Sequence, residues 1–100
     1  LGGIFVEVLG DTALRVAPFG RDTAEALLRD LRTYPLLEGR RGQAAGDVLA
    51  AVEVIAAVNR LTADFPEIAE IDLNPVRVHA AGMGCRALDA RLHLDEAAAS

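Results

Sequence analysis

The chain has 100 residues, of which 52% are hydrophobic and 25% are charged, and its formal net charge is −5. This length holds one small domain, and the composition is typical of a folded protein rather than a disordered one. The negative charge argues against nonspecific binding to nucleic acid. The apolar runs are too short to span a bilayer, and no signal-peptide pattern stands at the start. The single Cys85 excludes an internal disulfide and fits a reducing compartment. We therefore expect a cytoplasmic protein that binds neither nucleic acid nor a membrane.

The first elements are two strands. Residues 4–9 and 12–17 are rich in β-branched and apolar side chains, and the turn-forming pair Gly10 and Asp11 separates them. Together they predict a hairpin. A three-residue loop would place Glu7 and Arg15 opposite each other, whereas a two-residue loop would place them on opposite faces. The sequence leaves both registers open.

Two helices follow. Asp22 and Glu25 have the spacing of a capping box, before leucines and alanines at helical spacing, so a first helix is predicted over about residues 23–32. Asp47 can cap a second helix over about residues 48–63, whose surface is apolar nearly all round. Such a helix either lies centrally in the domain or is covered by a part of the protein outside this chain.

The segment between the helices, residues 34–46, is expected to be the main loop. Its glycines and the adjacent Arg40 and Arg41 could cradle a phosphate, and the alternative is a surface connector with a charged tip. It is not a Walker A loop, because no G-K-[ST] follows. We expect its Leu36 and Leu37 to insert into the core.

Two strands joined by a short break are expected near the carboxyl end. The run E-I-D-L-N-P alternates polar and apolar residues, which places Glu70, Asp72 and Asn74 on one face. If residues 80–83 form a hairpin loop, Asn74 faces Asp89 and Asp72 faces Arg91. Carboxylate and amide oxygens are the ligands that hard divalent cations such as Mg²⁺ prefer. The hairpin is therefore a candidate metal site, and the alternative is the solvated face of an ordinary hairpin with a cross-strand Asp–Arg pair.

The predicted order is strand, strand, helix, helix, strand, strand. This order favours an α+β two-layer sandwich, with a mainly antiparallel sheet and two helices on one of its faces. The other face is expected to carry all or some of a polar set that consists of Arg15, Asp72, Asn74 and Asp89.

Five motifs occur in a fixed order along the chain: L-G-G-I-F-V-E-V-L-G-D, L-R-V-A-P, Y-P-L-L-E-G-R-R-G, D-F-P-E-I-A-E-I-D-L-N-P-V and A-L-D-A-R. In this order they resemble the ATP-grasp domain of the NDP-forming acyl-CoA synthetases, which include the ADP-forming acetate–CoA ligases and are related to the succinyl-CoA synthetase beta subunit. The resemblance covers essentially the whole chain. It implies that residues 1–93 are the second, carboxy-terminal subdomain of an ATP-grasp domain and that residues 94–100 are a tail. The start without Met is consistent with a fragment of a longer protein.

The resemblance also implies a ligand set. Asp72, Asn74 and Asp89 match the metal ligands of the family, and Arg15 and Arg91 match positions that contact the phosphates of ATP or ADP. The implied chemistry is phosphoryl transfer, in which Mg²⁺ neutralises the phosphates and arginines stabilise the equatorial oxygens.

The rest of the implied machinery lies outside this chain. Coenzyme A and the phosphohistidine relay of these enzymes belong to other domains, and neither His79 nor His93 matches the relay histidine. We therefore assign no catalytic residue to the fragment and expect it to be inactive alone. The expected partners are the missing first ATP-grasp subdomain and the CoA-binding and ligase domains, in the same protein or a partner subunit. A homo-oligomer is compatible with this arrangement.

Two other functions stay open at this point. The parent protein could be a regulator, with a synthetase-like region fused to a GNAT lysine acetyltransferase. The chain could also be an interaction module that dimerises through the helix over residues 48–63 and has no metal affinity. The role of Glu7 is likewise open: it can be structural or part of the site.

Overall fold

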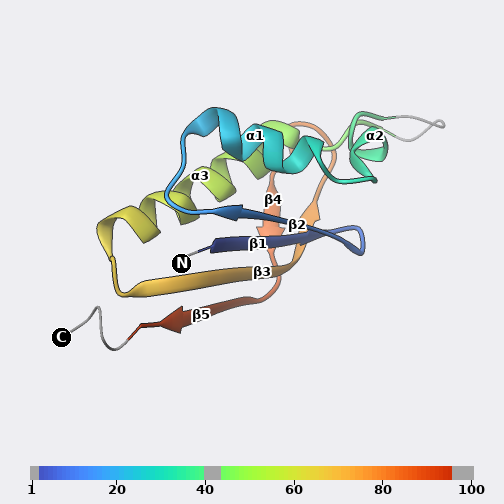
Figure 1. Cartoon of the computed structure of the whole chain (residues 1–100). Coiled ribbons are helices and arrows are strands. Elements are labelled where there is room, and N and C mark those ends of the chain that lie inside the picture. The colour runs from blue at the N-terminus through green and yellow to red at the C-terminus, as the bar shows by residue number, and fades with distance from the viewer. Residues whose placement is uncertain (1–2, 40–43, 96–100) are drawn as a thin grey trace.

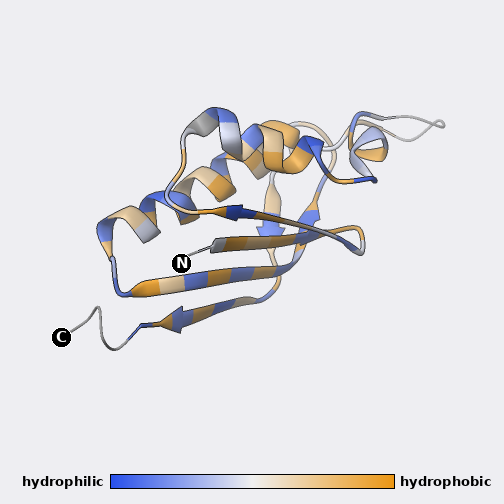
Figure 2. Ribbon diagram, in the orientation of Figure 1, coloured by the Kyte–Doolittle hydropathy of each residue, from blue (hydrophilic) through white to orange (hydrophobic). Residues whose placement is uncertain are grey.

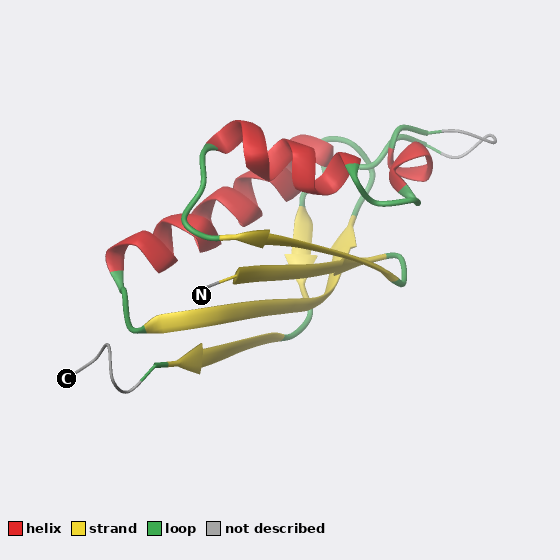
Figure 3. Cartoon of the chain, in the orientation of Figure 1, coloured by secondary structure: helices red, strands yellow, loops and turns green. Residues whose placement is uncertain are grey.

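The computed structural model describes residues 3–39 and 44–95, which form one sheet with helices on one of its faces (Figure 1, Figure 3). The strands are β1 (Gly3–Val8), β2 (Asp11–Val16), β3 (Ile68–Val78), β4 (Cys85–Ala87) and β5 (Ala90–Leu94). The helices are α1 (Arg21–Arg29), α2 (Tyr34–Leu37) and α3 (Val48–Asp64). The predicted α+β sandwich, with its helices on one face, is confirmed.

β3 is the central strand of the sheet. It pairs in parallel with β1, which in turn pairs antiparallel with β2. On its other side β3 pairs antiparallel with β5 along its first half and with β4 along its second half. The sheet is therefore mainly antiparallel, as predicted, with one parallel pair. That pair needs a long crossover connection, which the helices provide.

The β1–β2 hairpin has a two-residue loop. Leu9 and Gly10 both have positive φ, 55° and 76°, as the turns that suit the right-handed twist of a hairpin require. Ile4 consequently lies opposite Arg15. Residues directly opposite each other share a face, so Arg15 is on the face of Ile4 and Glu7 is on the other. The structure thus settles the register that the sequence left open.

The core lies between the sheet and the helices. The largest fully buried side chains come from β1, β3, α1 and α3: Ile4, Val6, Val8, Leu27, Leu28, Ile55 and Ile71. Each such aliphatic side chain contributes roughly 1.5–3 kcal/mol through burial. No polar or charged residue is buried among those the structure describes. Burial of apolar surface is therefore the main force that holds the two layers together.

The predicted capping box of α1 is wrong. The helix begins at Arg21, and its N-cap is Gly20, whose carbonyl accepts from the backbone N–H of Thr23 at 3.0 Å. Because the chain becomes helical before Asp22, this carboxylate lies inside the first turn and caps nothing. The Glu25 side chain instead forms an ion pair with Arg29 one turn further on, at 2.6 Å.

The Asp47 cap of α3 is confirmed, and it does more than predicted. One carboxylate oxygen accepts from the N–H of Ala50 at 3.1 Å, and the other accepts from the N–H of Gly84 at 2.8 Å. These bonds, led by that from Gly84, hold the pKa of Asp47 below its usual range. One side chain thus ties the start of α3 to the turn between β3 and β4.

α3 packs on one side only. Ala51, Val52 and Ile55 are buried in the core, whereas Leu49 is 67% exposed. Of the two arrangements expected for this apolar helix, the central one is therefore wrong. Cover from a part of the protein outside this chain stays a prediction. Among the described residues, no helix has the length and apolarity needed to cross a lipid bilayer.

The segment between α1 and α3 differs partly from the prediction. Residues 34–37 form the short helix α2, with Pro35 in its first turn, where the missing N–H of proline is tolerated. Leu37 is buried as predicted, whereas Leu36 is only half-buried. The phosphate cradle expected at Arg40 and Arg41 lies outside the described residues, as does most of the expected tail. β5 itself runs to Leu94.

Candidate functional site

The predicted register of the carboxy-terminal hairpin is confirmed. His79 donates its backbone N–H to the carbonyl of Gly84 at 3.0 Å, so the loop spans residues 80–83. Further along, Asp72 lies opposite Arg91, and the N–H of Asn74 donates to the carbonyl of Asp89 at 3.1 Å. β4 and β5 are thus two pieces of one returning strand.

β3 divides its side chains between two faces. Ile71 and Leu73, each 2% exposed, point toward the helices, and the intervening Asp72 and Asn74 point to the face that carries no helix. Figure 2 shows this alternation as bands of hydrophilic and hydrophobic residues along β3 and β5. We call the face without helices the open face.

A hollow of about 160 Å³ lies on the open face, and four residues line it: Asp72, Asn74, Asp89 and Arg91. The Nε of Arg91 is 3.9 Å from a carboxylate oxygen of Asp89, and both side chains are well exposed. An ion pair this long and exposed contributes little to stability. Two carboxylates and one guanidinium leave the hollow with a net negative charge, and all four groups are accessible to a ligand.

Other residues of the open face flank this hollow. Phe5 of β1 lies directly beside Asp72. Glu70, two residues before Asp72 in β3, lies opposite His93 of β5. The motifs did not bring Phe5 or Glu70 into the candidate site. Nothing in the local pattern shows that β1 is the parallel neighbour of β3, because residues far apart in sequence form that pair. The alternation does predict Glu70 on the face of Asp72, as the structure has it, but the ligand set implied by the motifs leaves Glu70 out.

Arg15 is not part of this hollow. It lies opposite the fully buried Ile4, on the face that the helices cover, and forms an ion pair with Asp30 at the end of α1. The expectation that it shares a face with Asp72 is therefore wrong. The cause is the two-residue β1–β2 loop, because a change of one residue in register moves a side chain to the opposite face.

The chemistry of the hollow suits a hard divalent cation that also has ligands from elsewhere. Asp72, Asn74 and Asp89 offer carboxylate and amide oxygens, the donors that Mg²⁺ prefers. No group of three or more His, Cys, Asp or Glu residues able to hold a metal occurs in the described part of the chain. Mg²⁺ commonly takes only one or two carboxylates from a protein and completes its shell with water and substrate phosphates. The donor set therefore fits Mg²⁺ bound together with a phosphorylated ligand.

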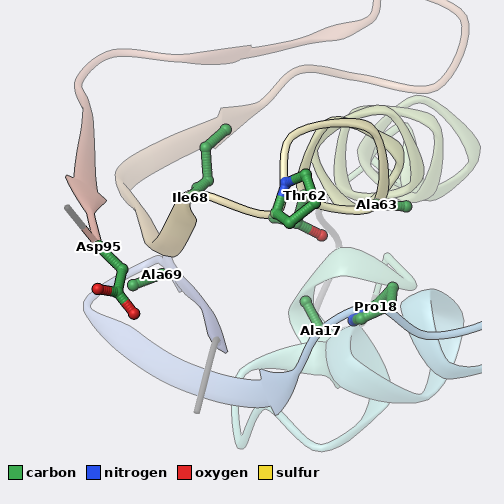
Figure 4. Close-up of a pocket in the computed structure, with 8 residues that line it drawn as sticks. Ala17, Pro18, Thr62, Ala63, Ile68, Ala69 and Asp95 are labelled. Carbon is green, nitrogen blue, oxygen red and sulfur yellow. The ribbon is translucent and has the colours of Figure 1, made fainter. Parts of the chain in front are cut away.

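A larger hollow, of about 440 Å³, lies at the end of the sheet where β3 begins (Figure 4). Its lining is mostly small or apolar, and its polar side chains are those of Thr62 and Asp95. It lacks the converging polar groups that fix a ligand's orientation. The smaller hollow is the better candidate site because it gathers two carboxylates, an amide and a guanidinium.

Cys85 lies outside both hollows. Burial raises the pKa of its thiol, and the nearby charge of Asp47 raises it further. A raised pKa disfavours the thiolate, which is the reactive form. The chain thus places Cys85 in the partly buried margin of the core, as a structural residue.

Comparisons with known proteins agree with the motifs. The profile of a family described as ATP-grasp domain matches residues 1–94. The chain is 42% identical, over 94 residues, to an ADP-forming 4-hydroxybutyrate–CoA ligase of Nitrosopumilus maritimus, a match that covers 94% of this chain and 14% of that protein. It is 40% identical to the beta subunit of ADP-forming acetate–CoA ligase II of Pyrococcus furiosus, and covers 40% of that subunit.

A solved structure shares the fold. The dinucleotide-forming acetyl-coenzyme A synthetase 1 of Candidatus Korarchaeum cryptofilum, in complex with coenzyme A and Mg-AMPPCP, superposes with a TM-score of 0.71 at 35% identity. The match covers 85% of this chain and 39% of that one, and in that structure a phosphohistidine segment points towards the nucleotide-binding site. The resemblance inferred from the motifs is confirmed: the chain spans between 14% and 40% of the relatives named here and belongs to the ATP-grasp domain family.

Proposed function

We propose that this chain supplies the Mg²⁺- and nucleotide-phosphate-binding face of an ADP-forming acyl-CoA synthetase. The observation that carries the proposal is the gathering of Asp72, Asn74, Asp89 and Arg91 around one accessible hollow on the open face. The relatives are ADP-forming acyl-CoA ligases, which supports the same chemistry. The reaction would move a phosphoryl group between ADP and an acyl phosphate or phosphohistidine.

Each residue of the hollow has a distinct role in this proposal. Asp72, Asn74 and Asp89 hold Mg²⁺, which neutralises the negative charge of the phosphates when it is bound. Arg91, whose Nε lies 3.9 Å from Asp89, contacts a phosphate oxygen. Arg15 has no part in this arrangement as the structure stands, because it pairs with Asp30 on the other face.

The chain needs other parts of the protein for turnover. Its share of the relatives is too small to include a whole ligase, and one relative carries the matching segment on a separate beta subunit. We propose that the first ATP-grasp subdomain closes over the nucleotide and that coenzyme A binds to domains elsewhere. The isolated chain should therefore be inactive.

The test uses the full-length protein that contains this segment. Formation of ATP from ADP and phosphate is measured with acyl-CoA and Mg²⁺, for the wild type and for Asp72→Ala and Asp89→Ala. We expect both variants to lose at least about a hundredfold in rate, because each removes a metal ligand in the transition state. Asp64→Ala, which removes an exposed carboxylate at the end of α3, is the matched control and should keep wild-type activity.

Two outcomes would contradict the proposal. An active wild type whose rate is untouched by either substitution would make the hollow an ordinary solvated sheet face. An inactive wild type, tested over a range of acyl-CoA thioesters, would favour the regulatory, acetyltransferase-linked alternative.

A further inference from the structure

β5 is exposed on both of its faces. Every residue from Ala90 to Leu94 is exposed, and Figure 1 shows the strand at the edge of the sheet, away from the helices. Leu92 lies opposite the buried Ile71, so its side chain is on the helix side, yet it is 49% exposed. Leu94 is on the same side and is 63% exposed. The helices thus leave a strip of apolar surface uncovered along β5.

The backbone of β5 is open on the side away from β3. The carbonyl of Asp89 accepts from the N–H of Asn74 in β3 at 3.1 Å, and the N–H of Asp95 donates to the carbonyl of Glu67, just before β3, at 2.7 Å. In an antiparallel pair every second residue points its backbone groups toward the partner. Arg91 and His93 therefore bond inward, and the N–H and C=O groups of Ala90, Leu92 and Leu94 point to the free edge. Among the described residues, β5 pairs only with β3.

The opposite edge strand, β2, exposes Leu14 and Val16 on its open face but is covered on its other face. β2 contains the buried Ala13, and Arg15 reaches from β2 to Asp30 at the end of α1. Edge strands that expose apolar side chains together with unpaired backbone are normally covered or paired in native proteins. β5 differs in that it has no such cover on either face within the described residues.

We propose that a β-strand from the rest of the same polypeptide, outside residues 1–100, pairs with the free edge of β5. The relatives supply the reason to place it there, because the matched segment is 40% or less of their length and leaves ample chain for another strand. The side chains of β5 define the chemistry of this strand. It is apolar on the face that covers Leu92 and Leu94, and it carries acidic or hydrogen-bond-accepting groups beside Arg91 and His93.

This pairing has a consequence for the hollow. Arg91 lines it from β5, so the added strand would lie directly beside Arg91 and form a further wall on the open face. Pairing of a strand with β5 does not depend on nucleotide binding, and protection of the backbone amides reports it directly.

The test is hydrogen–deuterium exchange at single-residue resolution on the full-length protein. The inward amides of Arg91 and His93 serve as an internal reference, since β3 protects them in any case. We expect the outward amides of Leu92 and Leu94 to be slowed to a similar degree, at least about a hundredfold relative to an unstructured peptide. Alternating protection, with slow inward and fast outward amides, would overturn the proposal.

A variant and a dilution series complete the test. Leu92→Glu should expose the outward amides of β5, whereas Leu49→Glu, at an exposed leucine on α3, should leave them protected. Protection that is unchanged in Leu92→Glu would contradict the proposal. Protection that disappears on dilution would also contradict it, because the added strand would then come from a second copy of the protein.

Discussion

The two faces of the sheet differ in chemistry although the same strands build them. On the covered face, Ile71 and Leu73 pack beneath the helices and are almost fully buried. On the open face, the alternate residues Asp72 and Asn74 line a hollow that solvent reaches. The period of two along β3 therefore separates the residues that stabilise the fold from those available to a ligand. A substitution at one position and a substitution at the next should have different kinds of effect.

The largest effect tests this separation within one strand. Ile71→Ala removes a side chain that is 2% exposed and should cost about 2–5 kcal/mol, because the cavity left behind cannot fully collapse. The neighbouring Asp72→Asn should change stability by less than about 1 kcal/mol, because its side chain is only half-buried. Native-state hydrogen exchange of the β1 and β3 amides in the full-length protein measures both changes. A loss of stability in Asp72→Asn as large as that in Ile71→Ala would show that the open face stabilises the fold as much as the covered face does.

A smaller effect is expected where a polar side chain supports the covered face. Asn59 of α3 accepts from the N–H of Phe19 at 2.7 Å and donates to its carbonyl at 2.5 Å. Asn59→Ala would leave both partly buried backbone groups unpaired and should cost about 1–3 kcal/mol. Arg60→Ala, at the exposed neighbouring position, is the control. Its free energy of unfolding should stay within about 0.5 kcal/mol of the wild-type value. Urea denaturation compares the two variants, and equal midpoints would refute the importance of this amide.

The smallest effect is a dependence on pH at the edge of the covered layer. The folded pKa of Asp47 is lowered by its bonds from Gly84 and Ala50, so the ionised carboxylate favours the folded state. This contribution is fully present above the unfolded pKa, near 3.8, and is lost as the pH falls through the lower folded pKa. Asp47→Asn should therefore show a shallower fall in melting temperature on acidification than the wild type. If the melting temperatures of the wild type and of Asp47→Asn fall equally with pH across that range, Asp47 contributes no pH dependence to stability.

The carboxy-terminal hairpin could be predicted from sequence because two local signals agree. Alternation puts Asp72 and Asn74 on one face, and the length of the loop then decides which residues face them. Both signals come from residues close together in the chain. The gathering of Asp72, Asn74, Asp89 and Arg91 follows from them, and the structure shows this gathering.

Three other features could not be predicted, because they depend on information that local sequence patterns lack: the face that carries Arg15, the place of Phe5 beside the hollow and the start of α1. Arg15 was misplaced because the β1–β2 loop could have two residues or three, and only Leu9 and Gly10 with positive φ settle it. Phe5 was missed because the parallel pairing of β1 with β3 joins distant segments. The start of α1 at Arg21 was missed because the backbone of Gly20 caps the helix, and its cap carries no side-chain signal.

The central claim is that the open-face hollow binds nucleotide phosphate through Mg²⁺. Its most direct test is the affinity of the full-length protein for ADP, measured by titration calorimetry with and without Mg²⁺. We predict that Asp72→Asn and Asp89→Asn each reduce the Mg²⁺-dependent gain in affinity by at least about tenfold, and that Asp64→Asn leaves it unchanged. If both hollow variants keep the wild-type gain, the claim is wrong and the Mg²⁺ and phosphate site lies elsewhere in the protein.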